Sequence, residues 1–166
     1  MSKLVGDQLP DDLYQRLLGN DLEQSAEKVI FLATVDEGGW PHLAMLSYFE
    51  VIAKDQRNLR LATYNSSRTT RNMRANGKAT ISIVDERTVF YIKGNVAEIN
   101  REMECAPQNS KLHFRVVQVL ADAANEEFEP GAYVASGVIY KNPGRMQQLQ
   151  TAKEVLRELA EDRLLD

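Results

Sequence analysis

Residues 61–78, LATYNSSRTTRNMRANGK, cover the end of an expected strand, a turn, and the whole of a short expected helix. The strand is expected at 59–63, directly after a polar turn at 54–58. Ser67 is a favourable N-cap residue, so a helix is expected from about 68 to 75, and Gly77 supplies the left-handed residue that ends it. This stretch therefore predicts a strand that passes through a tight turn into a short helix.

On both sides of this stretch, apolar and β-branched runs are separated by short polar turns. The expected strands are 29–35, 40–53, 59–63, 79–84, 89–99 and 132–140, with turns at 36–39, 54–58 and 85–88. A parallel βαβ sheet needs a helix between successive strands, and most of these strands follow one another directly. The pattern therefore favours an antiparallel barrel.

Three more helices are expected around this barrel. The first is 10–19, where Pro10 and two acidic residues suit the positive end of a helix dipole. The second is 111–125, because apolar residues recur there at helical spacing, namely Leu112, Val116, Val119, Leu120 and Ala123. The third is a long amphipathic helix at 143–163. Its apolar stripe is Met146, Leu149, Ala152, Leu156 and Leu159, and its water-facing residues are Glu154, Arg157, Glu158 and Glu161.

Composition places the chain among compact globular proteins. The 166 residues are 43% hydrophobic and 27% charged, which suits one globular domain. The pattern of expected strands and helices places this domain in the α+β class, mainly β, with its barrel core at about 28–140. A net charge of −4 argues against general affinity for nucleic acid or an anionic membrane. No run is long and apolar enough to span a bilayer, and the N-terminus lacks a signal-peptide core, so a cytoplasmic location is expected.

The titratable residues that usually form catalytic or metal centres are scarce. Cys105 is the single cysteine, so no intramolecular disulfide can form, and an inert thiol is expected. His42 and His113 are the only histidines, which leaves little for a metal site or a catalytic triad. No metal site and no catalytic residue are predicted.

Arg68 is the informative residue of the short helix. A cation in the first turn opposes the positive helix end by a few tenths to about 1 kcal/mol, unless an anion lies between them. Ser67, Thr69 and Thr70 add hydroxyl groups to the free N–H groups of that turn, so the set outlines a phosphate site. The alternative is that Arg68 and the helix's other two arginines are solvated surface charges.

The segment from 31 to about 98 resembles the FMN-binding split β-barrel of the pyridoxamine 5'-phosphate oxidase-like proteins, including general-stress and flavin-reductase-like members. The resemblance rests on four features in order along the chain: ATVDEGGWPHLAML at 33–46; LAT at 61–63 leading to the Ser67-Arg68 turn; RNMRANGK at 71–78, close to an Asn-Leu-Arg-x-Asn-Pro pattern; and IKGNVAE at 92–98, like a strand with Gly followed by Ala-Glu.

The resemblance implies a six-stranded antiparallel split β-barrel that pairs as a homodimer, with FMN in two clefts at the interface. It assigns Met45, Leu46 and Ser47 to the isoalloxazine ring. It assigns the ribityl phosphate to the end of the third strand and the following turn, which are Thr63, Ser67 and Arg68, with Ala62 and Thr69 in the same site.

Two departures from the family pattern concern the cofactor. Thr69 stands where many members carry a lysine after the Ser-Arg pair, and His42 is the only candidate for a basic residue that many carry near Ala44. Losing one cationic phosphate contact costs roughly 1.5 to 3 kcal/mol, or about ten- to a hundredfold in affinity. Two functions therefore stay open: an FMN-dependent oxidoreductase, or a flavin-free split-barrel homodimer that binds haem, a deazaflavin or a phosphorylated small molecule.

Overall fold

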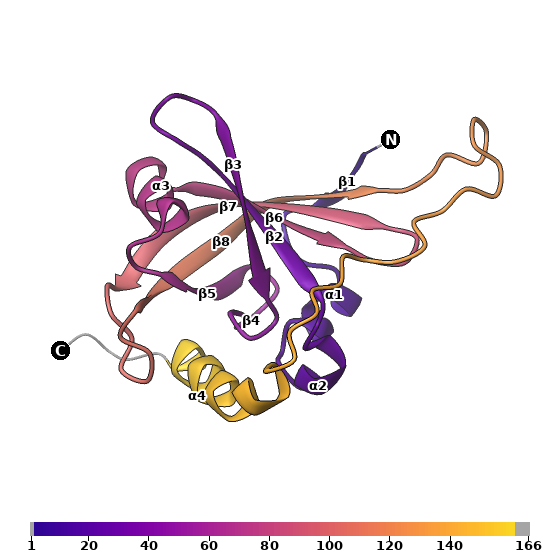
Figure 1. The fold of residues 1–166 in the computed structure, drawn as a ribbon. Coiled ribbons are helices and arrows are strands. Elements are labelled where there is room, and N and C mark those ends of the chain that lie inside the picture. The colour runs from indigo at the N-terminus through magenta and orange to yellow at the C-terminus, as the bar shows by residue number, and fades with distance from the viewer. Residues whose placement is uncertain (1, 162–166) are drawn as a thin grey trace.

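The computed structural model describes residues 2–161 and contains one curled antiparallel sheet of eight strands (Figure 1). The strands are β1 (Lys3–Gly6), β2 (Val29–Val35), β3 (Pro41–Ser47), β4 (Val51–Ala53), β5 (Asn58–Tyr64), β6 (Lys78–Val84), β7 (Val89–Asn100) and β8 (Asn109–Asp122). The helices are α1 (Asp11–Arg16), α2 (Leu22–Ser25), α3 (Arg68–Asn76) and α4 (Leu149–Ala160), with a 3-10 turn at Met146–Gln148.

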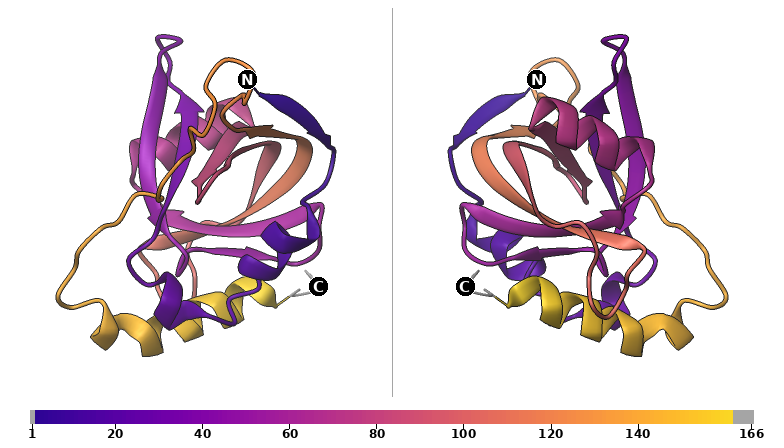
Figure 2. Two further views of the ribbon diagram at one scale, coloured as in Figure 1. Left: turned by 90° about the vertical axis from the view of Figure 1, so that its right-hand side faces the viewer. Right: turned by 90° about the vertical axis from the view of Figure 1, so that its left-hand side faces the viewer.

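The sheet runs in the order β3-β2-β6-β7-β8-β5-β4, and β1 pairs with β8 outside this path. Its two end strands, β3 and β4, are joined by the turn at 48–50 and share no ladder within the described residues. The sheet therefore curls around an interior but stays open between its end strands (Figure 2). This is the predicted antiparallel split β-barrel, so the fold class is confirmed, although the sheet has eight strands within residues 2–161 rather than the six predicted.

Two apolar cores hold the sheet and helices together. The larger lies inside the curled sheet, where Phe114 and Ile92 are fully buried and Leu13 of α1 closes one end. The smaller joins α4 to β4 and β5 through residues such as Leu156, Phe49 and Ala62. Among the described residues, every helix is too short or too polar to cross a lipid bilayer.

The helix predicted at 111–125 is wrong, because these residues form most of strand β8. Leu112, Phe114 and Val116 alternate into the barrel, as expected for a strand. The register between β7 and β8 then shifts at a bulge next to Gly94, so the next fully buried residue is Val119. This shift gives the sequence a spacing of four and then three, which imitates a helix.

The strand predicted at 132–140 is also wrong. This segment is extended but irregular and forms a single bridge, between Lys28 and Ile139. Beside that bridge, the Val29 N–H donates to the Val138 carbonyl. A β-prone segment cannot become a strand where only a few backbone groups of a neighbouring strand are free to pair with it.

Smaller corrections concern element ends. The segment predicted as strand 40–53 is interrupted by the turn at 48–50, and the helix predicted at 10–19 is only α1, followed by a turn at Gly19. The C-terminal helix starts at Leu149 rather than 143; residues 162–163 of the predicted helix lie outside the described residues. Glu158, predicted to face water, is buried with 9% of its surface exposed.

Candidate functional site

Helix α3 is fixed to the sheet by the motif that suggested the family. The buried Asn72 amide donates from Nδ2 to Thr34 Oγ1 at 3.0 Å, and Asn76 Nδ2 donates to the Val35 carbonyl at 2.6 Å. Met73 fills the barrel core, and Gly77 ends the helix with φ of 62°, as predicted. These residues hold the helix in place, so the motif indicates mainly how the chain folds and not what it binds.

Arg74 is a structural residue rather than a free surface charge. Its guanidinium donates to Glu98 Oε1 on β7 at 3.0 and 2.5 Å, to the Asn65 carbonyl at 2.9 Å and to Ser110 Oγ on β8 at 3.0 Å. The hydrogen bond from Arg74 is the main reason that the pKa of Glu98 is lowered. Arg74 therefore ties the last turn of α3 to two strands.

A closed network of hydroxyl groups lies beneath the first turn of α3. Thr70 Oγ1 donates to the Tyr64 carbonyl at 2.7 Å, and it also contacts Thr63 Oγ1 at 2.6 Å and Ser67 Oγ at 3.1 Å. A hydroxyl has one proton, so the Thr63 and Ser67 hydroxyls donate to Thr70. Ser67 Oγ also accepts from the Thr70 N–H, as an N-cap should. The predicted phosphate ligands Thr63 and Ser67 thus already have partners.

Arg68, by contrast, is exposed at the start of α3. Its side chain makes no hydrogen bond or ion pair within residues 2–161, and it lines a pocket of about 320 Å³ together with Arg71, Asp36 and Glu37. The N–H groups of Arg68 and Thr69 belong to the first helical turn and have no partner inside the helix. The Thr69 side chain is only 5% exposed. The open donors here are the Arg68 guanidinium and the N–H groups of Arg68 and Thr69.

The predicted ring-binding residues lie on β3, which within residues 2–161 pairs only with β2 and so has a free edge. Met45 is 58% exposed on the outer face, whereas Leu46 points into the barrel core. Alternate residues of this edge strand leave backbone N–H and C=O groups unpaired by β2, and these can contact a planar ring. Ala62 is fully buried beneath α4, so its side chain is not available to a ligand.

Ser47 ends β3 against a buried carboxylate. Its N–H and its hydroxyl donate to Glu50 Oε2 at 2.6 and 2.8 Å. Burial raises the pKa of Glu50, although the Ser47 hydrogen bonds and the charge of Arg145 lower it in part. The Arg145 guanidinium lies 5.2 Å from the centre of the Phe49 ring. Ser47 therefore helps to fix the turn between β3 and β4.

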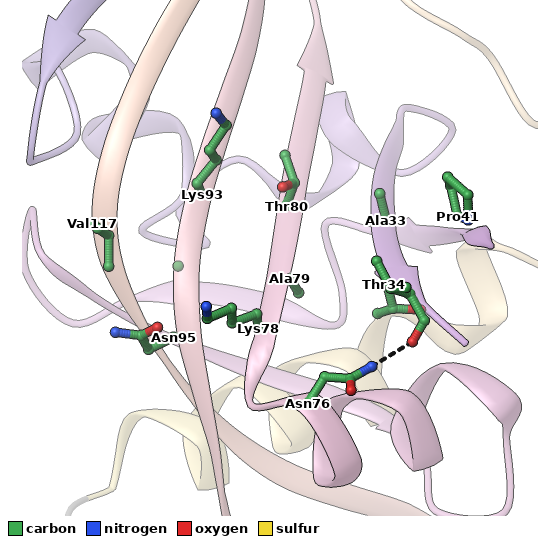
Figure 3. Close-up of a pocket in the computed structure, with 12 residues that line it drawn as sticks. Ala33, Thr34, Pro41, Asn76, Lys78, Ala79, Thr80, Lys93, Asn95 and Val117 are labelled. Carbon is green, nitrogen blue, oxygen red and sulfur yellow. Dashed lines mark hydrogen bonds between the residues drawn. The ribbon is translucent and has the colours of Figure 1, made fainter. Parts of the chain in front are cut away.

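A larger cleft, of about 700 Å³, lies at the α3 end of the sheet and was not predicted (Figure 3). It is lined by residues from five strands, including Val35, Pro41, Lys78, Thr80, Lys93, Asn95 and Val117. Asn76 lines both this cleft and the Arg68 pocket, so the two hollows adjoin. Sequence alternation on β7 could have placed Lys93 and Asn95 on one face, but only the sheet order, in which β6 alone separates β7 from β2, brings them to the same cleft as the β2 residues.

Other candidate centres are absent from the described part of the chain. No cluster of three histidine, cysteine, aspartate or glutamate residues there is arranged to hold a metal ion. Cys105 lies against Glu158, and burial, a hydrogen bond from the thiol to that carboxylate and its negative charge raise the cysteine's pKa to about 12. The side chain of His42 is half-buried on β3, near the α3 end of the sheet.

Comparison with known proteins identifies the class. The sequence model of the pyridoxamine 5'-phosphate oxidase family matches residues 22–129, which is more than half of the chain. The protein therefore belongs to this family, as the motifs predicted. The family match covers the sheet from before β2 to past β8, together with α3.

Individual relatives agree with this assignment. The chain is 28% identical to the uncharacterized protein YclD of Bacillus subtilis over 151 residues, which are 91% of this chain and 95% of that protein. A solved structure from Lactobacillus delbrueckii, provisionally named a pyridoxamine 5'-phosphate oxidase, superposes with a TM-score of 0.56 at 16% identity over 72% of this chain and 98% of that one. HupZ of Group A Streptococcus gives a TM-score of 0.54 at 16% identity over 70% and 98%. At these identities the two structures support the fold alone.

Proposed function

We propose that the protein is an FMN-binding, oxidoreductase-like homodimer in which Arg68 is the main ligand of the cofactor phosphate. The observation that carries the proposal is the free guanidinium of Arg68 beside the open amides of the α3 N-terminus. An anion at this point turns an unfavourable charge–dipole arrangement into a favourable one. Family membership makes FMN the first candidate for that anion.

The ring of the cofactor would lie along the free edge of β3, beside Met45. The unpaired backbone groups of that edge supply hydrogen-bond donors and acceptors, and the exposed Met45 side chain supplies an apolar contact. When bound, FMN supplies hydride or electron transfer itself, so the protein's part is to bind and orient it. We assign no catalytic residue, because no acid or base is needed for a hydride exchange.

The available donors fit a phosphate, but with fewer contacts than a strong site has. The hydroxyls of Thr63 and Ser67 donate within the network around Thr70, and Thr69 carries no charge. Asp36 and Glu37 line the same pocket as Arg68 and repel an anion. We therefore expect FMN to bind more weakly than in family members that have a lysine at this position.

The proposal is tested by comparing FMN with riboflavin, which lacks the phosphate. Arg68→Ala should weaken FMN about tenfold or more, since a charge-assisted contact is lost, and should leave riboflavin binding unchanged. The matched control is Arg71→Ala, one turn farther along α3, where the side chain donates to the Ser66 carbonyl at 3.2 Å. Fluorescence titration of both flavins measures the effect, and equal losses for the two flavins would refute the phosphate role of Arg68.

A second substitution tests the departure at Thr69. Thr69→Lys should tighten FMN binding, with little change for riboflavin, because it adds a cation beside the first-turn amides. Isothermal titration with both ligands is the measurement. If FMN affinity does not rise, the phosphate does not lie next to residue 69.

A second candidate function is a flavin-free homodimer that binds another planar or phosphorylated small molecule. The closed Thr63–Thr70–Ser67 network favours it, because these hydroxyls are not free to donate to a phosphate. Haem and deazaflavins are candidate ligands of this kind. A colourless purified protein that shows no thermal shift with FMN, but a shift with haem or a deazaflavin, would replace the first proposal with the second.

A further inference from the structure

An arm at 123–131 projects beyond the end of β8, well away from the body of the barrel (Figure 1). Phe128 lies on this arm with 72% of its surface exposed. It is flanked by three carboxylates, Glu126, Glu127 and Glu129. Phe128 is thus among the most exposed large apolar side chains of residues 2–161. An exposed aromatic side chain can serve as an anchor in a contact between proteins.

The tip of the arm is ordered by its own hydrogen bonds. The Asn125 carbonyl accepts from the N–H groups of Phe128 at 3.0 Å and Glu129 at 2.7 Å, and Asn125 Oδ1 accepts from the Glu127 N–H at 2.9 Å. Glu126 Oε2 accepts from the Gly131 N–H at 3.1 Å. Much of the entropy cost of fixing the tip is therefore already met before it contacts anything.

The cleft beside α3 has the complementary chemistry. Val35 and Val117 give it apolar walls, and Lys78 and Lys93 place two ammonium groups along it (Figure 3). Neither lysine side chain makes a hydrogen bond or an ion pair within residues 2–161. An apolar hollow bordered by two unpaired cations suits an aromatic side chain flanked by carboxylates.

The arm of a chain points away from that chain's own cleft. Lys78, the first residue of β6, pairs with Asn95 near the middle of β7, whereas the arm leaves β8 after Asp122, which pairs with Val89 at the start of β7. Six residues of strand separate these two points, which is about 20 Å, and the arm extends farther outward (Figure 1). A second copy of the chain can bring its arm to the cleft where the same chain cannot.

We propose that two copies exchange their arms, so that Phe128 of each chain enters the other chain's cleft and Glu127 and Glu129 pair with Lys78 and Lys93. A two-fold axis makes the contact reciprocal, so each dimer contains it twice. The inference rests on the homodimer of the proposed function and names the surfaces that form it.

Charge reversal on each side tests the contact. One variant carries Glu127→Lys and Glu129→Lys, and the other carries Lys78→Glu and Lys93→Glu. Each alone places like charges in both contacts and should weaken its homodimer about tenfold or more, as measured by sedimentation equilibrium. Mixed in equal amounts, the two variants should form a heterodimer, because both of its contacts then join opposite charges. Circular dichroism establishes that each variant is folded.

A matched control reverses two exposed carboxylates elsewhere, with Glu23→Lys and Glu102→Lys, and should leave dimerisation unchanged. Phe128→Ala should weaken the dimer about tenfold or more through lost apolar contact in both clefts, without changing the monomer's thermal stability. Two variants that dimerise like the wild type, or a mixture that forms no heterodimer, would overturn the arm exchange while the proposed homodimer stands.

Other outcomes separate this inference from the proposed function. A wild-type protein that is monomeric at all concentrations would overturn both the arm exchange and the homodimer. A Lys78→Glu and Lys93→Glu variant that stays dimeric but no longer binds FMN would show that the cleft holds the ligand, and would overturn the arm exchange alone.

Discussion

The N-terminal end of α3 and the C-terminal end of α4 are two helix ends on one sheet, and they are treated in opposite ways. At the start of α3, the Arg68 side chain and the N–H groups of Arg68 and Thr69 have no partner within residues 2–161. At the end of α4, Lys111 Nζ donates to the carbonyls of Glu158 at 2.5 Å and Glu161 at 2.7 Å, and Lys54 Nζ donates to the Ala160 carbonyl.

Cationic side chains lie at both helix ends, but the N-terminal end of α3 carries the positive partial charge of its helix dipole and the C-terminal end of α4 carries the negative one. Lys111 and Lys54 meet the negative end of α4, which is favourable, whereas Arg68 meets the positive end of α3, which is not. A closed, favourable end contributes to stability. An open, unfavourable end is kept in a fold only at some cost, and a bound anion would remove that cost. This difference is the physical reason to expect an anionic ligand at the N-terminal end of α3.

The largest expected effect is at the closed end. Lys111→Met should lower the free energy of unfolding by about 3 kcal/mol, because two carbonyls lose a charge-assisted donor in a site where Lys111 is buried. Urea denaturation at pH 7 measures the loss. Lys153→Met, on the exposed face of α4, is the control and should change stability by less than about 0.5 kcal/mol. A loss no larger than that of the control would mean that α4 is not held through its carbonyls.

The second-largest expected loss of stability is for a change at Glu158. Its carboxylate accepts from the N–H groups of Glu104 at 2.8 Å and Cys105 at 2.9 Å. Burial raises its pKa, but the hydrogen bonds from Cys105 and Glu104 outweigh burial, so the pKa in the folded protein is lowered. Glu158→Gln keeps one acceptor and should cost about 1 to 2 kcal/mol at pH 7.

The direction of this shift fixes the pH dependence. A lowered pKa in the folded protein means that Glu158 contributes stability above its ordinary value of 4.5, and that this stability is lost as pH falls through the lower folded value. The Glu158→Gln variant should lack that part of the acid-induced loss, with Glu154→Gln as the control.

Glu158→Gln should also affect the Cys105 thiol. It should lower the Cys105 pKa from about 12 and speed alkylation of the thiol at pH 9. Equal alkylation rates in the variant and the wild type would show that Glu158 does not raise the pKa of this thiol.

The sequence predicted α3 within a residue because its signals are local. Ser67 accepts from the Thr70 N–H, and Gly77 takes the left-handed conformation, and both can be read without knowing the fold. Strand β8 was missed because its alternation is interrupted by a tertiary feature. A side chain at Gly94 would come within 2.2 Å of the Phe114 ring, so the bulge there depends on the packing of two strands that are distant in sequence.

The candidate site divides in the same way. The position of Arg68 in the first turn of α3 could be predicted, because Ser67 is a local N-cap signal, whereas its role as a phosphate ligand stays a prediction. The partners of the Thr63 hydroxyl could not, because they depend on how the end of β5 meets α3. Lys78 and Lys93 were missed because the cleft exists only once β2, β6, β7 and β8 lie in order.

Arg74 lies in the last turn of α3 and has hydrogen-bond partners, so it can be compared with Arg68, which lies in the first turn of the same helix and has none within residues 2–161. Arg74→Ala removes the hydrogen bonds to Glu98 and Ser110 and should destabilise the protein by about 1 to 1.5 kcal/mol, a value reduced for the partial exposure of the pair. Because the pKa of Glu98 is lowered, this contribution is present above pH 4.5 and declines as pH falls further. Urea denaturation at pH 7 and pH 3.5 should therefore show a smaller difference between variant and wild type at the lower pH.

The smallest expected effect is at the open end, and it has the opposite sign. Arg68→Ala removes a cation from the positive end of α3 and breaks no contact within residues 2–161, so stability without ligand should stay the same or rise by a few tenths of a kcal/mol. In the presence of saturating FMN the order should reverse, because the wild type gains more from binding than the variant does. Thermal denaturation with and without FMN measures both. A loss of stability in the absence of ligand would mean that Arg68 is a structural residue like Arg74, and the distinction between the open and closed helix ends would fail.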